Sequence, residues 1–108
     1  MSYKIELTNN FKKEAKKLIK KYASLRAEIA ELGKELAQNP TTGTPLGNDV
    51  YKIRFAIASK NKGKAGGARV ISFVKIINKT VYLLAIYSKG EKDTMTDKEI
   101  ETLLEEYL

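Results

Sequence analysis

The stretch ARVISFVKIINKTVYLLAIY, Ala68 to Tyr87, contains two apolar runs that decide the fold. Both runs are apolar at successive positions, which is typical of central strands that are covered on two faces. The pair Asn78-Lys79 between them indicates a short hairpin loop. The stretch therefore predicts two antiparallel strands at the centre of a sheet.

A third strand is predicted upstream, in VYKIRFAI, Val50 to Ile57. Residues two apart along a strand share a face, so Lys52 and Arg54 are expected side by side on one face. The other face then carries Tyr51, Ile53, Phe55 and Ile57. The preceding segment PTTGTPLGND is rich in proline and glycine and predicts a turn-rich connector.

The N-terminal part predicts one strand and two helices. Ser2 to Thr8 alternates between apolar and polar residues, which indicates a half-buried strand. Apolar residues then recur at helical spacing from residue 9 to 22, with Asn10 expected to cap this helix. A second helix follows Ser24 and ends before Asn39-Pro40, because the residue before proline avoids the helical region.

The C-terminal part predicts a last helix that opens with a capping box of Thr96 and Glu99. The expected fold class is therefore α+β, with an N-terminal strand, a two-helix hairpin, a mainly antiparallel four-stranded sheet and a C-terminal helix. The length of 108 residues fits one domain, residues 1–108.

Composition narrows the possible chemistry. The chain has no cysteine and no histidine, which excludes disulfides, zinc-finger ligation, thiol nucleophiles and imidazole bases. Any catalysis must use lysine, arginine, tyrosine or carboxylates, and no metal or other cofactor is expected. No apolar run approaches the roughly 18 residues of a membrane span, so we expect a cytoplasmic protein with no membrane partner.

Positive charge is concentrated in the first part of the chain. Through Gly90 there are eighteen basic and six acidic side chains, whereas from Glu91 onward there are two basic and seven acidic ones. A clustered positive charge is typical of a protein that binds a polyanion, since each neutralised phosphate releases counterions. Nucleic acid is the leading candidate, ahead of an anionic membrane surface or an acidic protein.

The segment KNKGKAGGARV, Lys60 to Val70, concentrates this charge. It has four basic side chains and three glycines and no acidic group, and its glycine spacing matches neither a P-loop nor a dinucleotide fingerprint. The simplest interpretation is a solvated connection between strands. Since its lysines cannot neutralise one another and its glycines allow close approach to a ligand, a phosphate backbone suits it better.

Several strings along the chain resemble the RelE/ParE superfamily of bacterial toxins, especially its HigB-like members. They are NPTTG, VYKIRF, KNKGKAGGARVI, VYLLAIYSKGEKD and MTDKEIETLLEEYL. The resemblance implies a ribosome-dependent endoribonuclease that cuts mRNA and is silenced by a cognate antitoxin protein. ParE-like members instead poison DNA gyrase, and a basic module that binds RNA or the ribosome without chemistry is a further alternative.

The resemblance and the residue chemistry together suggest a site. Metal-free RNA cleavage needs the ribose 2′-hydroxyl to attack its own phosphate, so a proton must leave it, phosphate charge must be stabilised and the leaving oxygen must be protonated. Arg69 suits the charge, Lys52 beside Arg54 suits proton transfer, and Tyr87 suits protonation or base stacking. The candidate catalytic residues are Lys52, Arg54, Arg69, Tyr87 and Lys89, and the candidate RNA-binding residues are Lys60, Lys62, Lys64 and Lys92.

Two features of the best-known RelE-type members are missing here. The arginine that follows the lysine at the end of the last strand falls near Gly90, and the tyrosine a few residues beyond falls near Thr96. The roles of those two residues are therefore not transferred to this chain.

The hairpin loop decides whether a shared site exists. A two-residue loop sets Arg69 opposite Ser88 and leaves Tyr87 on the other face, because one residue of slip reverses every side chain. A three-residue loop sets Arg69 opposite Lys89, with Tyr87 on the same face. The shared site requires this second register or a bulge of equal effect, so we expect Arg69, Tyr87 and Lys89 on one face.

Overall fold

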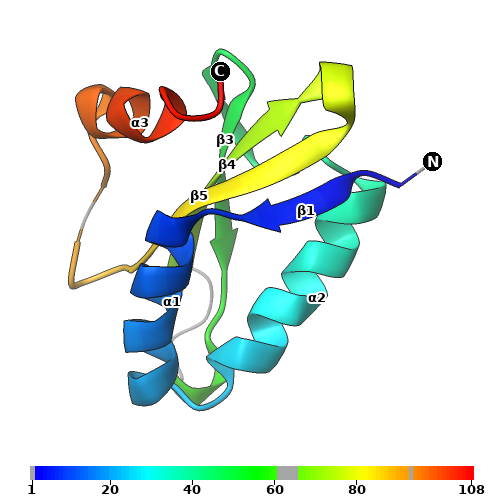
Figure 1. Cartoon of the computed structure of the whole chain (residues 1–108). Helices are drawn as coiled ribbons and strands as arrows, with labels where there is room; N and C mark the ends of the chain where they lie inside the picture. Colours follow the sequence, from blue (N-terminus) through cyan, green and yellow to red (C-terminus); the bar gives the residue numbers. More distant parts are fainter. Residues whose placement is uncertain (1, 61–65, 93) are drawn as a thin grey trace.

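The structure is a computed structural model, and it describes residues 2–60, 66–92 and 94–108 (Figure 1). The strands are β1 (Lys4–Leu7), β2 (Thr44–Gly47), β3 (Val50–Phe55), β4 (Ala68–Lys75) and β5 (Thr80–Ser88). The α-helices are α1 (Asn9–Lys21), α2 (Leu25–Gln38) and α3 (Asp97–Leu104), and two single 3₁₀ turns span Ala58–Lys60 and Ile76–Asn78.

The five strands form one sheet in the order β1-β5-β4-β3-β2, with β1 parallel to β5 and the other pairs antiparallel. The expected α+β architecture is confirmed, but the sheet has a fifth strand where a connector was expected. The strand β2 pairs with β3 through a two-residue turn at Asn48 and Asp49, whose φ angles are 54° and 63°. Such a left-handed turn fits the twist of a hairpin, and the edge position tolerates Pro45.

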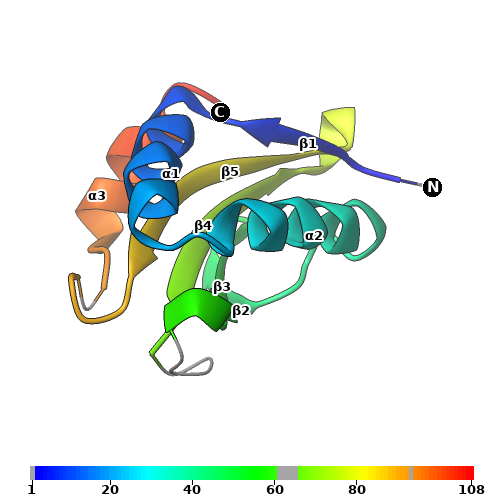
Figure 2. The ribbon, with the colours of Figure 1, turned by 90° about the horizontal axis from the view of Figure 1, so that it is seen from below.

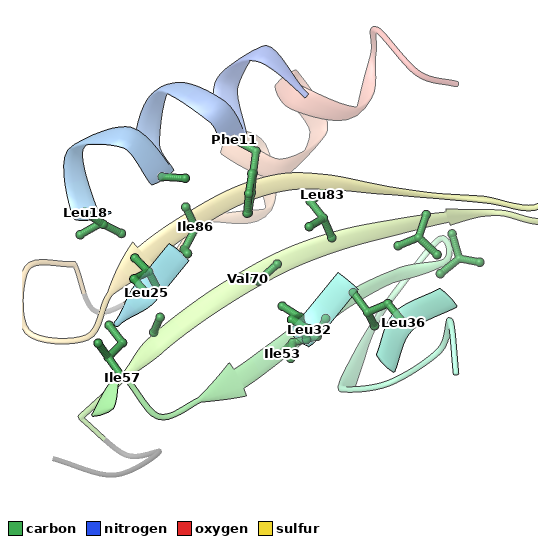
Figure 3. Packing of buried hydrophobic residues seen from close by; sticks show 14 residues of the cluster. Phe11, Leu18, Leu25, Leu32, Leu36, Ile53, Ile57, Val70, Leu83 and Ile86 are labelled. Atoms are coloured by element: carbon green, nitrogen blue, oxygen red, sulfur yellow. The ribbon is translucent and has the colours of Figure 1, made fainter. Parts of the chain in front are cut away.

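Both long helices cover the same face of the sheet (Figure 2). Figure 3 shows their apolar side chains directed at the strands, and Phe11 of α1 and Leu25 and Leu36 of α2 are fully buried there. On β3 this face carries the buried Ile53, so the predicted division of that strand into an apolar and a basic face is confirmed. No helix in the described part of the chain is long and apolar enough to cross a membrane.

The helix α3 covers part of the opposite face. Ile100 and Leu104 pack there against a second cluster that includes Val50, Ile71 and Phe73. The predicted capping box is confirmed, because the Thr96 and Glu99 side chains each accept a hydrogen bond from the backbone N–H of the other residue. This helix therefore shields one end of the face that carries the basic side chains of β3.

The cap of the first helix lies two residues earlier than expected. The N-cap is Thr8, whose hydroxyl accepts a hydrogen bond from the Phe11 backbone N–H at 3.1 Å. The prediction of Asn10 as the cap is wrong, because Asn10 lies inside the helix and its side chain donates instead to the Leu84 carbonyl at 2.9 Å. The second helix follows Ser24 and ends at Gln38, before Asn39-Pro40, as predicted.

The connection between β4 and β5 differs from both expected loops. Lys75 pairs with Thr80, so four residues from Ile76 to Lys79 form the connection, and Lys79 closes it with a φ of 48°. That register alone would leave Arg69 opposite Ile86. The ladder shifts, however, since Ser72 pairs with Leu83 whereas Ile71 pairs with Ala85. The residue between these partners, Leu84, is therefore the extra residue of a β-bulge.

Candidate active site

The bulge sets Arg69 of β4 directly opposite Tyr87 of β5, and Arg54 of β3 is the partner of Arg69 on the other side. The three residues form one row across three strands on the face opposite α1 and α2. Directly opposite residues of antiparallel strands have Cβ atoms about 4.5–5.5 Å apart. Lys52 lies two residues from Arg54 and therefore shares this face. The prediction that a bulge or an equivalent register places Arg69 and Tyr87 on one face is confirmed.

Lys89 continues the same register beyond the end of β5. Its backbone N–H donates to the Gly67 carbonyl at 2.9 Å, so antiparallel pairing extends past the pair Ala68 and Ser88. The alternation places Lys89 on the face of Tyr87, two residues away. The predicted arrangement of Arg69, Tyr87 and Lys89 on one face agrees with this register.

Burial differs sharply among the residues of this face. Arg54 is exposed and Lys52 is half-buried, whereas Arg69 and Tyr87 are only 4% and 6% exposed to solvent. The Arg69 guanidinium donates to the Ala68 carbonyl at 3.3 Å. A polyanion that approaches this face therefore meets Arg54 and Lys52 first, and contact with the Arg69 guanidinium requires the side chains around it to shift.

The Tyr87 hydroxyl is buried and has no hydrogen-bond partner within the described residues. Leaving a buried hydroxyl unpaired costs about 1–3 kcal/mol, so this group gains a partner if the side chains around it shift and admit a ligand. The sequence predicted Tyr87 as a proton donor or stacking residue. Its position beside Arg69, with an unused O–H, suits the donor role.

Lys60, predicted to bind RNA, contacts other parts of the protein in the structure. Its ammonium group donates to the Ser88 hydroxyl at 2.6 Å and to the Lys89 carbonyl at 2.7 Å, and it lies 5.6 Å from the centre of the Tyr22 ring. These contacts tie the 3₁₀ turn after β3 to the end of β5. Lys62 and Lys64, the other predicted RNA-binding residues of this segment, lie outside the described residues.

Lys92 is paired with the capping box of α3. Its ammonium group lies 2.8 Å from the Glu99 carboxylate, and the two side chains are 39% and 44% exposed. Exposed ion pairs stabilise a protein weakly, so little free energy is lost when this pair opens. The hydrogen bond from Lys92, followed by those from Thr96, lowers the pKa of the Glu99 carboxyl from 4.5 to about 2.

This lowered pKa predicts an acid transition at the start of α3. A carboxyl whose pKa is lower in the folded state stabilises the fold above its unfolded pKa, and that contribution is lost as the pH falls from 4.5 towards 2. The Thr96 backbone N–H, which donates to Glu99 at 2.8 Å, reports the change by its NMR shift. We expect a midpoint near 2 in the wild type and no transition in Glu99→Gln. A midpoint near 4.5 would show that Lys92 and Glu99 are not paired in solution.

A small cleft lies beside the row, between α1 and the segment that follows β5. It has a volume of about 270 Å³, and its lining includes Glu14, Lys17, Tyr87 and Lys92. Burial raises the pKa of the Glu14 carboxyl, and hydrogen bonds from the Ile86 N–H and from Asn10 oppose this effect. Sequence analysis missed Glu14, because one glutamate among the lysines of a helix gives no sign that it lies against β5. Among the described residues, no group of three acidic side chains is placed to hold a metal ion.

Comparison with known proteins agrees with this architecture. A family model described as "RelE toxin of RelE / RelB toxin-antitoxin system" matches residues 3–106. A mutant of the E. coli toxin RelE in the free state superposes with a TM-score of 0.66 at 19% identity, over 100% of both chains. The toxin–antitoxin complex RelBE2 from Mycobacterium tuberculosis gives a TM-score of 0.63 at 18% identity, over 82% of this chain and 100% of that one. At these identities the two structures show a shared fold, whereas the family match extends over nearly the whole sequence. The chain therefore belongs to the RelE toxin family.

Proposed function

We propose that the chain is the toxin of a toxin–antitoxin system and acts as one domain, a ribosome-dependent endoribonuclease that cleaves mRNA without a metal ion. The observation that carries this proposal is the row of Arg54, Arg69 and Tyr87 across three strands, with Lys52 beside it. Membership of the RelE family also supports the proposed function as a toxin. Dependence on the ribosome and the choice of mRNA rest on the family resemblance alone.

The residues of the row match the needs of the reaction. The ribose 2′-oxygen attacks the adjacent phosphorus, the bond to the 5′-oxygen breaks, and the products carry a 2′,3′-cyclic phosphate and a 5′-hydroxyl. In this proposal Lys52 first gives its own proton to solvent and then accepts the proton of the 2′-hydroxyl, and the buried Tyr87 hydroxyl gives a proton to the leaving oxygen. Arg69 stabilises the charge that develops on the phosphate oxygens.

The remaining cations attract the RNA and hold it in place. Arg54 is exposed, and Lys89 follows Tyr87 on the same face, so both extend the positive surface around the row. In the proposal Lys92 leaves Glu99 and contacts the RNA backbone. Lys62 and Lys64 are proposed to bind the RNA as well. Each phosphate contact contributes affinity that falls as salt concentration rises.

Expression in a bacterium without a partner protein tests the proposal. Growth should stop, translation should fail, and mapping of RNA ends should show new cuts within translated codons that leave 5′-hydroxyl ends. Purified protein that has been treated with a metal chelator and then dialysed should cleave ribosome-bound mRNA as fast as untreated protein. Normal translation with failing DNA supercoiling would favour a gyrase poison. Growth arrest without new RNA ends would favour a binding module without chemistry.

A partner protein is part of this proposal, since a free ribonuclease would harm its host. The groove between α1 and α2 is the surface that fits it, with a volume of about 600 Å³. Its lining combines apolar side chains, including Leu7 and Ile19, with an exposed basic rim of Lys12, Lys16, Lys20 and Arg26. An amphipathic segment with acidic flanks complements both features, so we propose that the antitoxin docks such a segment here.

Charge reversal on the rim tests this docking surface. Lys16→Glu should weaken binding of the partner encoded by the adjacent gene about tenfold or more, because like charges across an interface cost several kcal/mol at low salt. Lys13→Glu is the matched control, since Lys13 is an exposed lysine of the same helix and is not part of the groove lining. Isothermal titration measures both affinities. Equal loss in the two variants would show a general charge effect and would exclude this groove as the docking surface.

A further inference from the structure

The strand β5 loses its neighbour at the middle of its length. The parallel pairing with β1 ends at Leu7 and Leu83, whereas β5 continues to Ser88. An uncovered strand edge presents backbone groups that need other partners. Three residues of the chain immediately after β1 supply them, namely Thr8, Asn10 and Glu14.

These side chains contact β5 at its bulge. The Asn10 amide donates to the Leu84 carbonyl at 2.9 Å, and the Glu14 carboxylate accepts from the Ile86 backbone N–H at 3.1 Å. The same Asn10 nitrogen donates to the same Glu14 oxygen at 2.9 Å, so the two side chains are joined to each other. The Thr8 hydroxyl donates to the Leu83 carbonyl at 2.9 Å, just before the bulge. The helix α1 thus binds the backbone on both sides of the extra residue Leu84.

The apolar pattern of β5 leaves its register poorly determined. The residues from Leu83 to Ile86 are all apolar and all buried, with Leu83 and Ile86 on the face of α1 and α2 and with Leu84 and Ala85 on the other face. Where both faces accept apolar side chains, a slip of one residue exchanges one apolar set for another. Polar contacts are needed to make one register unique. Without the bulge, Arg69 would stand opposite Ile86, and Tyr87 would leave the face of the row.

We propose that Asn10 and Glu14 form a clamp that holds β5 in its bulged register and so keeps Tyr87 opposite Arg69. Both are positioning residues, because they bind backbone groups of β5 rather than the substrate. The clamp itself follows from the geometry of the described residues, whereas its importance for RNA cleavage rests on the proposed function. Glu14 acts as a hydrogen-bond acceptor here, so an uncharged acceptor of the same shape should replace it.

Three variants of the full chain test the clamp. Glu14→Leu removes the acceptor, Glu14→Gln keeps an oxygen at the same place without the charge, and Asn10→Asp replaces the donor to Leu84 by an acceptor. Glu35→Leu is the matched control, since it makes the same chemical change at an exposed position of α2. In each variant, NMR measures amide hydrogen exchange at Ile86 and the cross-strand contacts between Arg69 and Tyr87. The rate of RNA cleavage is measured for the same proteins.

In Glu14→Leu and Asn10→Asp we expect exchange of the Ile86 amide to rise about tenfold or more, because the hydrogen bonds that hold this part of β5 are lost or weakened. The contacts between Arg69 and Tyr87 should weaken, and cleavage should fall by a similar factor. Glu14→Gln and Glu35→Leu should resemble the wild type in all three measurements. Should Glu14→Leu fail to fold, Asn10→Asp and Glu14→Gln give the same comparison.

Two results would overturn the clamp. One is a folded Glu14→Leu or Asn10→Asp protein with unchanged Ile86 exchange and unchanged contacts between Arg69 and Tyr87. The other is a Glu14→Gln protein as damaged as Glu14→Leu, because Glu14 would then act through its charge or its proton. If the wild-type chain cleaves no RNA, the proposed function fails by itself, and the NMR measurements still decide the clamp.

Discussion

Arg69→Ala should lower the rate of mRNA cleavage by about a hundredfold or more, the effect typical of losing one group that stabilises transition-state charge. Arg69 is the central member of the row and lies between Arg54 and Tyr87. Its planar guanidinium can hold two phosphate oxygens at once. The growth arrest caused by the wild-type chain should disappear with the cleavage.

Two further variants make this result specific. Arg69→Lys keeps the charge and loses the planar fork, so its activity should fall between those of the wild type and Arg69→Ala. Glu105→Ala changes an exposed residue just beyond α3 and should leave cleavage and growth arrest unchanged. Primer extension on ribosome-bound mRNA measures the rate, and thermal unfolding shows whether each variant is folded. An Arg69→Ala protein that is folded and fully toxic would exclude the proposed role of Arg69.

The faces of the sheet could be predicted from the sequence, because local alternation fixes them. In β3 the apolar and basic positions alternate, so Lys52 and Arg54 were placed on one face and Ile53 on the other, as the structure has them. In β5 no such alternation exists. The register of β4 and β5 therefore depended on the length of the connection and on the bulge at Leu84, and the residues that hold that bulge lie on α1, over seventy positions away.

Contacts between distant segments also explain why the surroundings of some residues could not be predicted from the sequence. Asn10 has the chemistry of a helix cap, and nothing near it in the sequence indicates that its amide reaches the Leu84 carbonyl. Lys60 belongs to a basic segment, but its ammonium group binds Ser88 and the carbonyl of Lys89. Charge and composition predict that a surface is basic. Contacts between distant segments decide which of its cations remain available to a ligand.

Gly67 is another residue whose role lies in a distant contact. The sequence suggested that the glycines of the basic segment allow a ligand to approach the backbone. At Gly67 the space is taken by the protein itself, since a Cβ atom there would lie 2.1 Å from the Phe55 carbonyl oxygen and 2.9 Å from the Ala56 Cα. Both are backbone atoms, which cannot move aside as the end of a flexible side chain can. The close contact lies at the pair Phe55 and Ala68, where β3 and β4 begin their pairing beside Arg69.

Gly67→Ala should therefore destabilise the fold by about 3 kcal/mol, at the upper end of the cost of overpacking, since the backbones of β3 and β4 must move apart. A loss of this size lowers the melting temperature of a domain of this length by about 10 °C or more. Gly33→Ala is the matched control, because a Cβ atom at Gly33 in α2 meets nothing within 4 Å. That variant should stabilise the fold by about 0.5–1 kcal/mol, as alanine loses less conformational freedom in a helix than glycine does. Chemical unfolding of the three proteins measures both effects, and a Gly67→Ala protein as stable as the wild type would show that β3 and β4 do not meet this closely in solution.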